Sequence, residues 1–300
     1  MPLLEQFDPK ALAALEGLDF KARYVMEGFL QGVHQSPFHG FSVEFSDYRD
    51  YQPGDDLKHL DWRLFARSDK LYIKRYLQET NVRFYIVCDT SASMAYGGDK
   101  AWGSKFECAR LLAAALTWFL LRQNDAAGLV AFRAGEKAPR FIRPSQRPSQ
   151  LGVLLRELEG LEPAGSECLV HLLENTVRLI HRRSVVLFFS DLLEPSSEVE
   201  RYFKQLRFHG HEVLVFQVLD RDELDFPFGE AKIFEDLETG MRRQVSPAQI
   251  RKLYLDRLNA FMTGWKELFQ ALEMPYCVVR TDENLWNALA LFLSERRKLK

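Results

Sequence analysis

The sequence predicts an α/β protein built on a doubly wound, mainly parallel sheet. Two runs of consecutive apolar residues, Phe84–Cys88 and Val185–Phe189, are typical of strands that helices cover on both faces. Strand-like segments alternate with helix-like segments from about residue 82 onward. Ligands of such sheets bind outside the carboxyl ends of the strands, where the strand order reverses. We therefore expect the chemistry of this protein at the ends of these two strands.

The N-terminal part of the chain differs from the rest in its residue types and in their periodicity. A helical pattern covers residues 9–33, and a segment dense in charged, aromatic and turn residues follows it. Residues 71–77 then alternate in polarity, as a half-buried strand does. We therefore divide the chain into an N-terminal extension with helical and β-rich parts, residues 1–80, and an α/β domain, residues 81–300.

Local patterns define the elements of the α/β domain. Ser104 and Glu107 fit a capping box at the start of a helix that ends near Gln123. A hairpin is expected over residues 232–245, and Ser246-Pro247 should cap and open a long helix. Further helices are expected at 149–159, 167–182, 197–208 and 283–297, and further strands at 128–132, 138–142 (an edge strand), 213–219 and 276–279.

Composition and charge narrow the possible functions. The 300-residue chain is 47% hydrophobic and 27% charged, and its formal net charge is −2. The apolar fraction is sufficient for a large hydrophobic core. The small negative net charge gives no positive electrostatic potential that would favour binding to nucleic acid or to an anionic membrane. The N-terminus lacks the pattern of a secretory signal, and no apolar run is long enough to span a bilayer. Four scattered cysteines favour neither a zinc site nor a disulfide framework, so we expect a cytoplasmic protein.

Oxygen-bearing side chains follow both apolar strands. Asp89, Ser91 and Ser93 come directly after the first strand, and Asp191 comes at the end of the second. Ser166 lies between them in sequence and offers a further hydroxyl. Carboxylates and hydroxyls are hard donors that suit Mg²⁺ or Mn²⁺. The alternative for the serines is that they cap helices, as serines after strands often do.

This pattern resembles the metal-ion-dependent adhesion site of von Willebrand factor A domains. By that resemblance, Ser91 and Ser93 would bind Mg²⁺ directly, while Asp89 and Asp191 would hold it largely through waters. Ser166 would take the place of the usual threonine, whose methyl group it lacks. Such an ion keeps one coordination position open, and an aspartate or glutamate of a partner protein can occupy it.

A second block, upstream, resembles the family known as domain of unknown function 58. The family's pattern is met in order by Gly32, His34, Ser36, Glu44, Phe45, Arg49, Tyr51, Pro53, Gly54, Asp55, Asp56, Asp61, Trp62, Ala66 and Arg67. The resemblance implies a MoxR-type AAA+ ATPase as a partner in protein maturation or complex assembly, and it names no reaction. From the residues alone, the charged and aromatic members of the block are either a salt-bridged structural shell or a docking surface.

We therefore expect a non-enzymatic, metal-dependent adaptor. It would bind another protein through a metal ion that is coordinated by a carboxylate of that protein. One alternative is a Mg²⁺-dependent phosphatase or phosphotransferase with Asp89 as nucleophile, although Ser91 stands where such enzymes place a general acid. The other alternative is a structural scaffold without a metal. The sequence contains neither a phosphate-binding P-loop, a dinucleotide-binding glycine motif nor a serine nucleophile elbow.

Overall fold

The computed structural model describes residues 15–34, 48–50, 72–74, 82–136, 138–163, 169–194, 197–229, 232–238 and 240–298. The chain divides into two compact units, residues 30–81 and residues 1–29 with 82–300. One boundary lies next to the division predicted at residue 80, and the larger unit also takes in residues 1–29. Within the smaller unit, the described strands β1 (Tyr48–Asp50) and β2 (Tyr72–Lys74) pair antiparallel.

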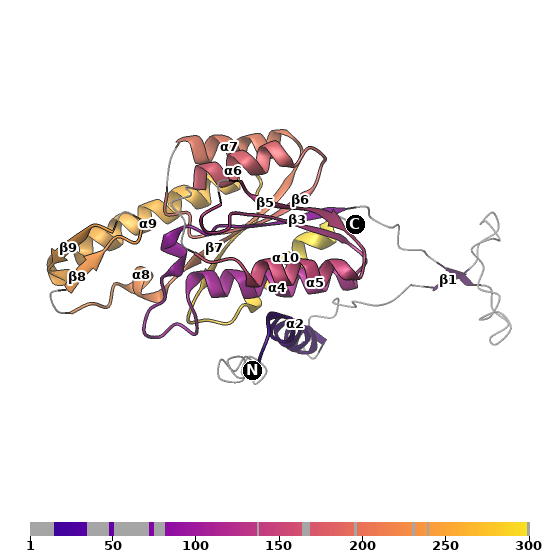
Figure 1. The fold of residues 1–300 in the computed structure, drawn as a ribbon, viewed down its shortest axis with the longest axis horizontal. Coiled ribbons are helices and arrows are strands. Elements are labelled where there is room, and N and C mark those ends of the chain that lie inside the picture. Colours follow the sequence, from indigo (N-terminus) through magenta and orange to yellow (C-terminus); the bar gives the residue numbers. More distant parts are fainter. Residues whose placement is uncertain are drawn as a thin grey trace. The chain divides into compact units, whose positions relative to one another are not determined.

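A six-stranded sheet organises the larger unit, in the order β10-β7-β6-β3-β4-β5 (Figure 1). Neighbouring strands pair in parallel, except that β5 runs antiparallel to β4 at one edge. The strand order reverses at β3, because β4 lies on one side of it and β6 on the other. This arrangement confirms the predicted fold class. The strands are β3 (Arg83–Cys88), β4 (Ala126–Ala131), β5 (Arg140–Ser145), β6 (Val185–Ser190), β7 (Glu212–Leu219) and β10 (Tyr276–Arg280).

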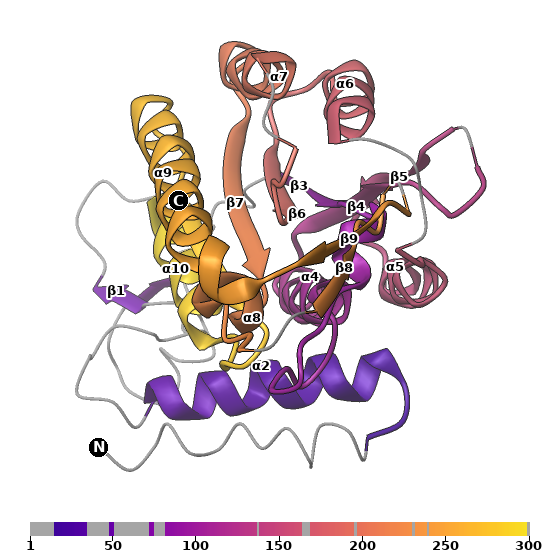
Figure 2. The same ribbon diagram turned by 90° about the vertical axis from the view of Figure 1, so that its left-hand side faces the viewer.

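Helices cover both faces of this sheet (Figure 2). Against one face pack α6 (Leu169–Leu179), α7 (Ser197–Phe208) and α9 (Pro247–Ala271). On the other face lie α4 (Lys105–Arg122), α5 (Ser149–Glu159) and α10 (Trp286–Lys298). Residues 18–29 of α2 (Leu18–His34) lie outside this helix layer, where Phe29 contacts Trp286 of α10. Strand β6 shows why a continuous apolar run is required, since Phe188 packs into the first layer and the neighbouring Phe189 points to the opposite face.

Most of the helices and strands predicted from the sequence are present in the structure, although many begin or end at residues other than the predicted ones. The capping box predicted at Ser104 and Glu107 is present at the start of α4. Ser246 occupies the N-cap position of α9 and Pro247 opens the helix, as predicted, although the Ser246 side chain makes no capping hydrogen bond. The edge strand continues through Pro144, which an edge position tolerates because one side of this strand has no partner strand in the described sheet.

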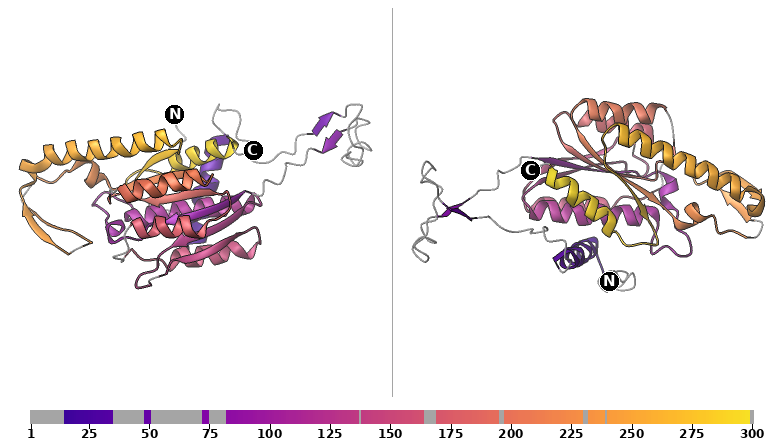
Figure 3. Two further views of the ribbon diagram at one scale, coloured as in Figure 1. Left: turned by 90° about the horizontal axis from the view of Figure 1, so that it is seen from above. Right: turned by 180° about the vertical axis from the view of Figure 1, so that it is seen from behind.

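In the described part of the larger unit, two short elements were not predicted from the sequence, and both lie next to the strand ends. They are η3, a 3₁₀ helix at Ala92–Ala95, and α8, at Arg221–Asp225. The predicted hairpin is formed by β8 (Lys232–Glu235) and β9 (Arg242–Val245), and it projects beyond the sheet together with the first turns of α9 (Figure 3). In the part of the chain that the structure describes, no helix combines the length and apolarity needed to cross a membrane.

Candidate metal centre

The two predicted carboxylates lie at the ends of adjacent strands. Asp89 follows β3, and its backbone N–H donates to the carbonyl of Phe189 in β6 at 2.9 Å. Asp191 follows β6, and its own carbonyl accepts a 2.8 Å hydrogen bond from the Gln217 side chain on β7. Both carboxylates are buried, with exposed fractions of 3% and 2%. Parallel pairing of β3 with β6 therefore brings together residues that are distant in the sequence.

The predicted hydroxyls lie with these carboxylates around one cavity. The Ser91 and Ser93 hydroxyl oxygens are 3.2 Å apart, and Ser93 Oγ donates to Asp191 Oδ2 at 2.7 Å. The cavity has a volume of about 370 Å³. Its described lining residues are Asp89, Ser91, Ser93, Leu169, Asp191, Leu193, Glu194 and Glu238. Four of the five predicted ligands therefore converge on one space.

The alternative that Ser91 serves as a helix cap is not supported. Ser91 occupies the N-cap position of η3, yet its side chain makes no capping hydrogen bond. The backbone N–H of Ser91 instead donates to Asp89 Oδ1 at 2.9 Å, so that the carboxylate shapes the turn after β3. The Ser91 hydroxyl is left facing that of Ser93, as a ligand pair would require.

Asp89 is held from two sides inside the sheet. Its Oδ2 accepts a hydrogen bond from Ser190 Oγ at 2.5 Å, while Oδ1 accepts from the Ser91 amide. Burial, and then the nearby charge of Asp191, raise the pKa of Asp89 to about 6. Two carboxylates therefore repel each other across this site, a repulsion that a bound cation would relieve.

Lys105, at the start of α4, is a cation that our sequence reasoning missed. Its side chain is fully buried, and its Nζ lies 2.8 Å from Asp191 Oδ2 and 2.7 Å from Glu223 Oε1. Burial by itself would lower the pKa of Lys105, but the two carboxylates raise it above its ordinary value. Lys105 is not among the described residues that line the cavity, so it neutralises Asp191 without filling the space beside it.

Glu223 links this lysine to the next strand end. Its Oε2 accepts from the Asp220 amide at 2.8 Å and completes a capping box at the start of α8. Burial raises the pKa of Glu223 despite the attraction of Lys105. Asp89, Asp191 and Glu223 together outnumber Lys105 as charges, so the buried cluster keeps a surplus of negative charge.

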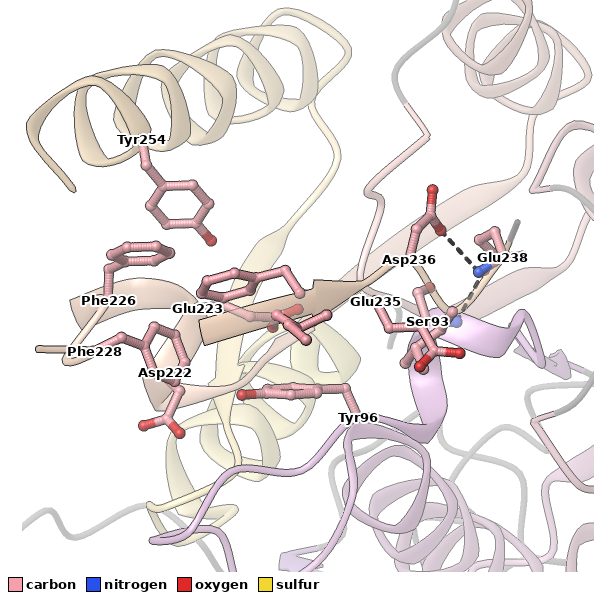
Figure 4. A pocket seen from close by; sticks show the side chains of 13 residues that line it. Ser93, Tyr96, Asp222, Glu223, Phe226, Phe228, Glu235, Asp236, Glu238 and Tyr254 are labelled. Carbon is pink, nitrogen blue, oxygen red and sulfur yellow. Dashed lines mark hydrogen bonds between the residues drawn. The ribbon is translucent and has the colours of Figure 1, made fainter. Parts of the chain in front are cut away.

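A further carboxylate comes from the hairpin. Glu238 Oε1 accepts a 2.9 Å hydrogen bond from the backbone N–H of Ser93 (Figure 4), and Glu238 also lines the cavity. The chain thus places one of its own exposed carboxylates beside the predicted ligands. This contact joins residues 145 positions apart in the sequence, so local patterns could not have shown it.

Two sequence signals could have identified part of what was missed. A lysine in the first turn of a largely apolar helix opposes the helix dipole, which favours anions there. Such a lysine therefore indicates an acidic partner nearby. Asp220 and Glu223 have the spacing of a capping box. Read together, these two signals point to an acidic strand end facing Lys105.

The remaining predicted site residues are not placed. Ser166 lies outside the described residues. In the upstream signature block, Arg49 lies in β1, where the structure describes the backbone only. Its other charged and aromatic members predicted as site residues lie outside the described residues: Glu44, Tyr51, Asp55, Asp56, Asp61, Trp62 and Arg67. Whether the block is a shell or a docking surface stays a prediction.

The donors at this site fit a hard divalent cation. Two carboxylates and two hydroxyls offer oxygen, the atom type that Mg²⁺ and Mn²⁺ prefer. Among the described residues, no three His, Cys, Asp or Glu side chains cluster as a metal site, so any ion here would depend on the hydroxyls of Ser91 and Ser93. Lys105 already neutralises part of the charge on Asp191, which lowers the attraction of this site for a cation.

Known proteins resemble the chain to different extents. An uncharacterized protein of Mycobacterium bovis is 27% identical over 298 residues, which cover 97% of this chain and 91% of the relative. An aerotolerance-related membrane protein from Bacteroides fragilis is 18% identical, over 72% of this chain and 99% of that one, with a TM-score of 0.49. The SpRpn10 VWA domain is 12% identical, over 69% of this chain and 93% of that one, with a TM-score of 0.38.

A family match covers more than half of the sequence. It extends over residues 47–260, from the described strand β1 to within α9, and so includes the ends of β3 and β6. The chain belongs to the family described as protein of unknown function DUF58.

Proposed function

We propose that this protein is a non-enzymatic adaptor that binds a protein partner through a divalent cation, Mg²⁺ or Mn²⁺. Asp89, Ser91, Ser93 and Asp191 would hold the ion, with Ser166 as a further hydroxyl ligand. The bound ion would supply a positive charge with a coordination position for an aspartate or glutamate of the partner. The partner we propose is a MoxR-type AAA+ ATPase, and the place of action is the cytoplasm.

The convergence of two carboxylates and two hydroxyls on one cavity is the observation that carries this proposal. The Ser91 hydroxyl is not engaged in capping, and Asp89 and Asp191 repel each other. These features suit cation binding, because a buried charge is stable only when it is paired, hydrogen-bonded or bound to a metal ion.

The non-enzymatic part of the proposal rests on the surroundings of Asp89. Both oxygens of Asp89 accept hydrogen bonds, and such bonds make a carboxylate a weaker nucleophile. Ser91 stands at the position where a phosphatase of this kind needs a proton donor. A phosphate-release assay with p-nitrophenyl phosphate tests this point, and turnover that disappears in Asp89→Asn would overturn the adaptor proposal.

A metal-free scaffold is the second candidate function, and Lys105 favours it. A buried ammonium group that already pairs with Asp191 lowers the gain from binding a metal ion. The two candidates predict different outcomes when the hydroxyls are removed. A scaffold needs neither Ser91 nor Ser93 for partner binding, whereas a metal-bridged adaptor needs both.

The test is an affinity measurement between the full chain and a purified MoxR-type ATPase from the same organism, in Mg²⁺ buffer. Ser91→Ala/Ser93→Ala is compared with Ser246→Ala, whose hydroxyl makes no capping hydrogen bond. Because all variants share one buffer, any Mg²⁺ requirement of the ATPase itself cancels. We expect the double variant to lose at least about tenfold in affinity, the scale of one charge-assisted contact.

Three outcomes separate the parts of this proposal. Loss in the double variant, retention in Ser246→Ala and loss of wild-type binding with EDTA support the metal bridge. Equal binding by all three proteins would contradict the metal bridge and support the scaffold. Absence of binding by the wild-type chain would contradict the choice of partner.

A further inference from the structure

A second cavity lies beside the candidate metal centre. It has a volume of about 440 Å³ and shares two lining residues, Ser93 and Glu238, with the first cavity. The hairpin forms one side of it, while α8 and α9 contribute the other side (Figure 4). A protein that docks at the metal centre would therefore present neighbouring residues to this second cavity.

The walls of the second cavity are aromatic. Phe226 stacks on Phe234 with ring centroids 5.8 Å apart, and it contacts Tyr254 at 4.5 Å. Phe228 meets Phe234 edge to face at 5.3 Å, and Tyr96 lies across the cavity from this cluster (Figure 4). Rings held by one another in this way offer fixed faces to a ligand at little conformational cost.

The rim is acidic. Asp222, Glu223, Glu235, Asp236 and Glu238 line the cavity, whereas no lysine, arginine or histidine is among its described lining residues. Two of these acids already have cationic partners, since Glu223 pairs with Lys105 and Glu235 with Arg242. Asp222 lies in a negative field, because Asp220 and Asp99 add to the effect of burial in raising its pKa.

Two exposed apolar side chains complete the lining. Ile233 and Leu237, on the hairpin, are 68% and 46% exposed. Apolar atoms and aromatic faces suit the methylene stem of a long side chain, and the acidic rim suits a positive charge at its end. An arginine has both features. Its planar guanidinium group stacks on aromatic rings and forms bidentate hydrogen bonds with carboxylates.

We propose that this aromatic, acid-rimmed cavity binds an arginine side chain of the partner protein, next to the partner carboxylate that the metal centre would receive. The inference deepens the proposed function and rests on it for the neighbouring carboxylate. The arginine contact itself needs no metal. The partner is thus defined by chemistry, as a surface that presents an acidic residue beside an arginine.

The test uses the full chain with ¹³C-labelled isoleucine and leucine methyl groups, in EDTA. Three capped tripeptides serve as probes: acetyl-Ala-Arg-Ala-amide, its citrulline analogue and its leucine analogue. Citrulline has nearly the shape of arginine but no charge. We expect the arginine probe to shift the methyl signals of Ile233 and Leu237 saturably, with the citrulline probe about tenfold weaker. The methyl signals of Leu253, exposed on α9 outside the cavity, should stay unchanged.

Charge variants provide the matched control. Asp222→Asn and Asp256→Asn change the net charge equally, but Asp256 is an exposed residue of α9 that does not line the cavity. We expect only Asp222→Asn to weaken the arginine probe, several-fold, and to leave the leucine probe unaffected.

Equal affinity for arginine and citrulline, equal effects of the two variants, or no shift at Ile233 and Leu237 would each overturn the inference. Because EDTA is present throughout, these results do not depend on the metal centre. A failed metal titration would therefore leave a positive arginine result standing, and a failed arginine titration would leave the metal bridge untouched.

Discussion

The buried charge cluster and the hairpin meet at one site but differ in how they are held. The cluster (Asp89, Lys105, Asp191 and Glu223) lies at the ends of central strands, and each member has several short polar contacts. The hairpin, residues 232–245, exposes apolar side chains and reaches the cluster's cavity through Glu238. The difference teaches that the packing of the sheet fixes the charged groups of the cluster, whereas the side chains of the hairpin are exposed and available for recognition.

Removal of the buried cation should give the largest effect. Lys105→Met leaves Asp191 and Glu223 without their ammonium partner in a dry environment, so we expect a loss of about 3–5 kcal/mol in the free energy of unfolding. Urea denaturation at pH 7 measures this loss. The control is Lys204→Met, which breaks an exposed pair with Glu200 at 3.2 Å and should cost no more than about 0.5 kcal/mol. Equal losses in the two variants would contradict the special role of the cluster.

The pH dependence of stability sharpens the same contrast. Burial raises the pKa of Glu223 above its ordinary value, so in the window above that value the folded chain binds more protons than the unfolded chain. The Glu223 contribution therefore makes the free energy of unfolding fall as pH rises. Glu223→Gln should remove this part of the decline, as measured by urea denaturation from pH 4 to 7 in EDTA.

The control for this pH series comes from the hairpin. Glu235 is paired with Arg242 at 2.9 Å, with both side chains largely exposed. Glu235→Gln should shift the stability curve by about 0.5 kcal/mol at most. A free energy of unfolding of Glu223→Gln that depends on pH in the same way as that of the wild type would show that folding does not raise the pKa of Glu223. That result would contradict this account of the cluster.

Substitutions on the hairpin should have the smallest effect on stability. Ile233→Ser and Leu237→Ser change exposed side chains, so we expect the free energy of unfolding to move by about 0.5 kcal/mol or less. Both should nevertheless weaken binding of the arginine tripeptide, because these side chains line its cavity. Leu253→Ser, equally exposed on α9, is the control. A large loss of stability in the hairpin variants would show that the hairpin belongs to the folded core.

The sequence allowed the sheet and part of the site to be predicted for one physical reason. A strand covered on both faces must be apolar throughout, so β3 and β6 stand out, and polar residues directly after them must lie at the same edge of a parallel sheet. This reasoning placed Asp89 and Asp191 at one edge of the sheet, and the pairing of β3 with β6 in the structure makes them neighbours.

Other parts of the site depend on packing between distant segments. Lys105 finds Asp191 and Glu223 only because α4 packs under β6 and β7, at sequence separations of 86 and 118. Glu238 reaches Ser93 from the tip of a hairpin whose direction no local pattern sets. Helix α8 has five residues, too few for a periodic hydrophobic pattern. The sequence signal that could have predicted this helix was its capping box.

A calorimetric titration of the full chain with Mn²⁺ at pH 7 tests the central claim most directly. The account predicts saturable, weak binding at a single site in the wild-type chain and in Ser246→Ala. It predicts no binding heat in Ser91→Ala/Ser93→Ala, since the two hydroxyls would be direct ligands. Equal heats in all three proteins, or no heat in the wild-type chain, would contradict the claim that these strand ends form a metal centre.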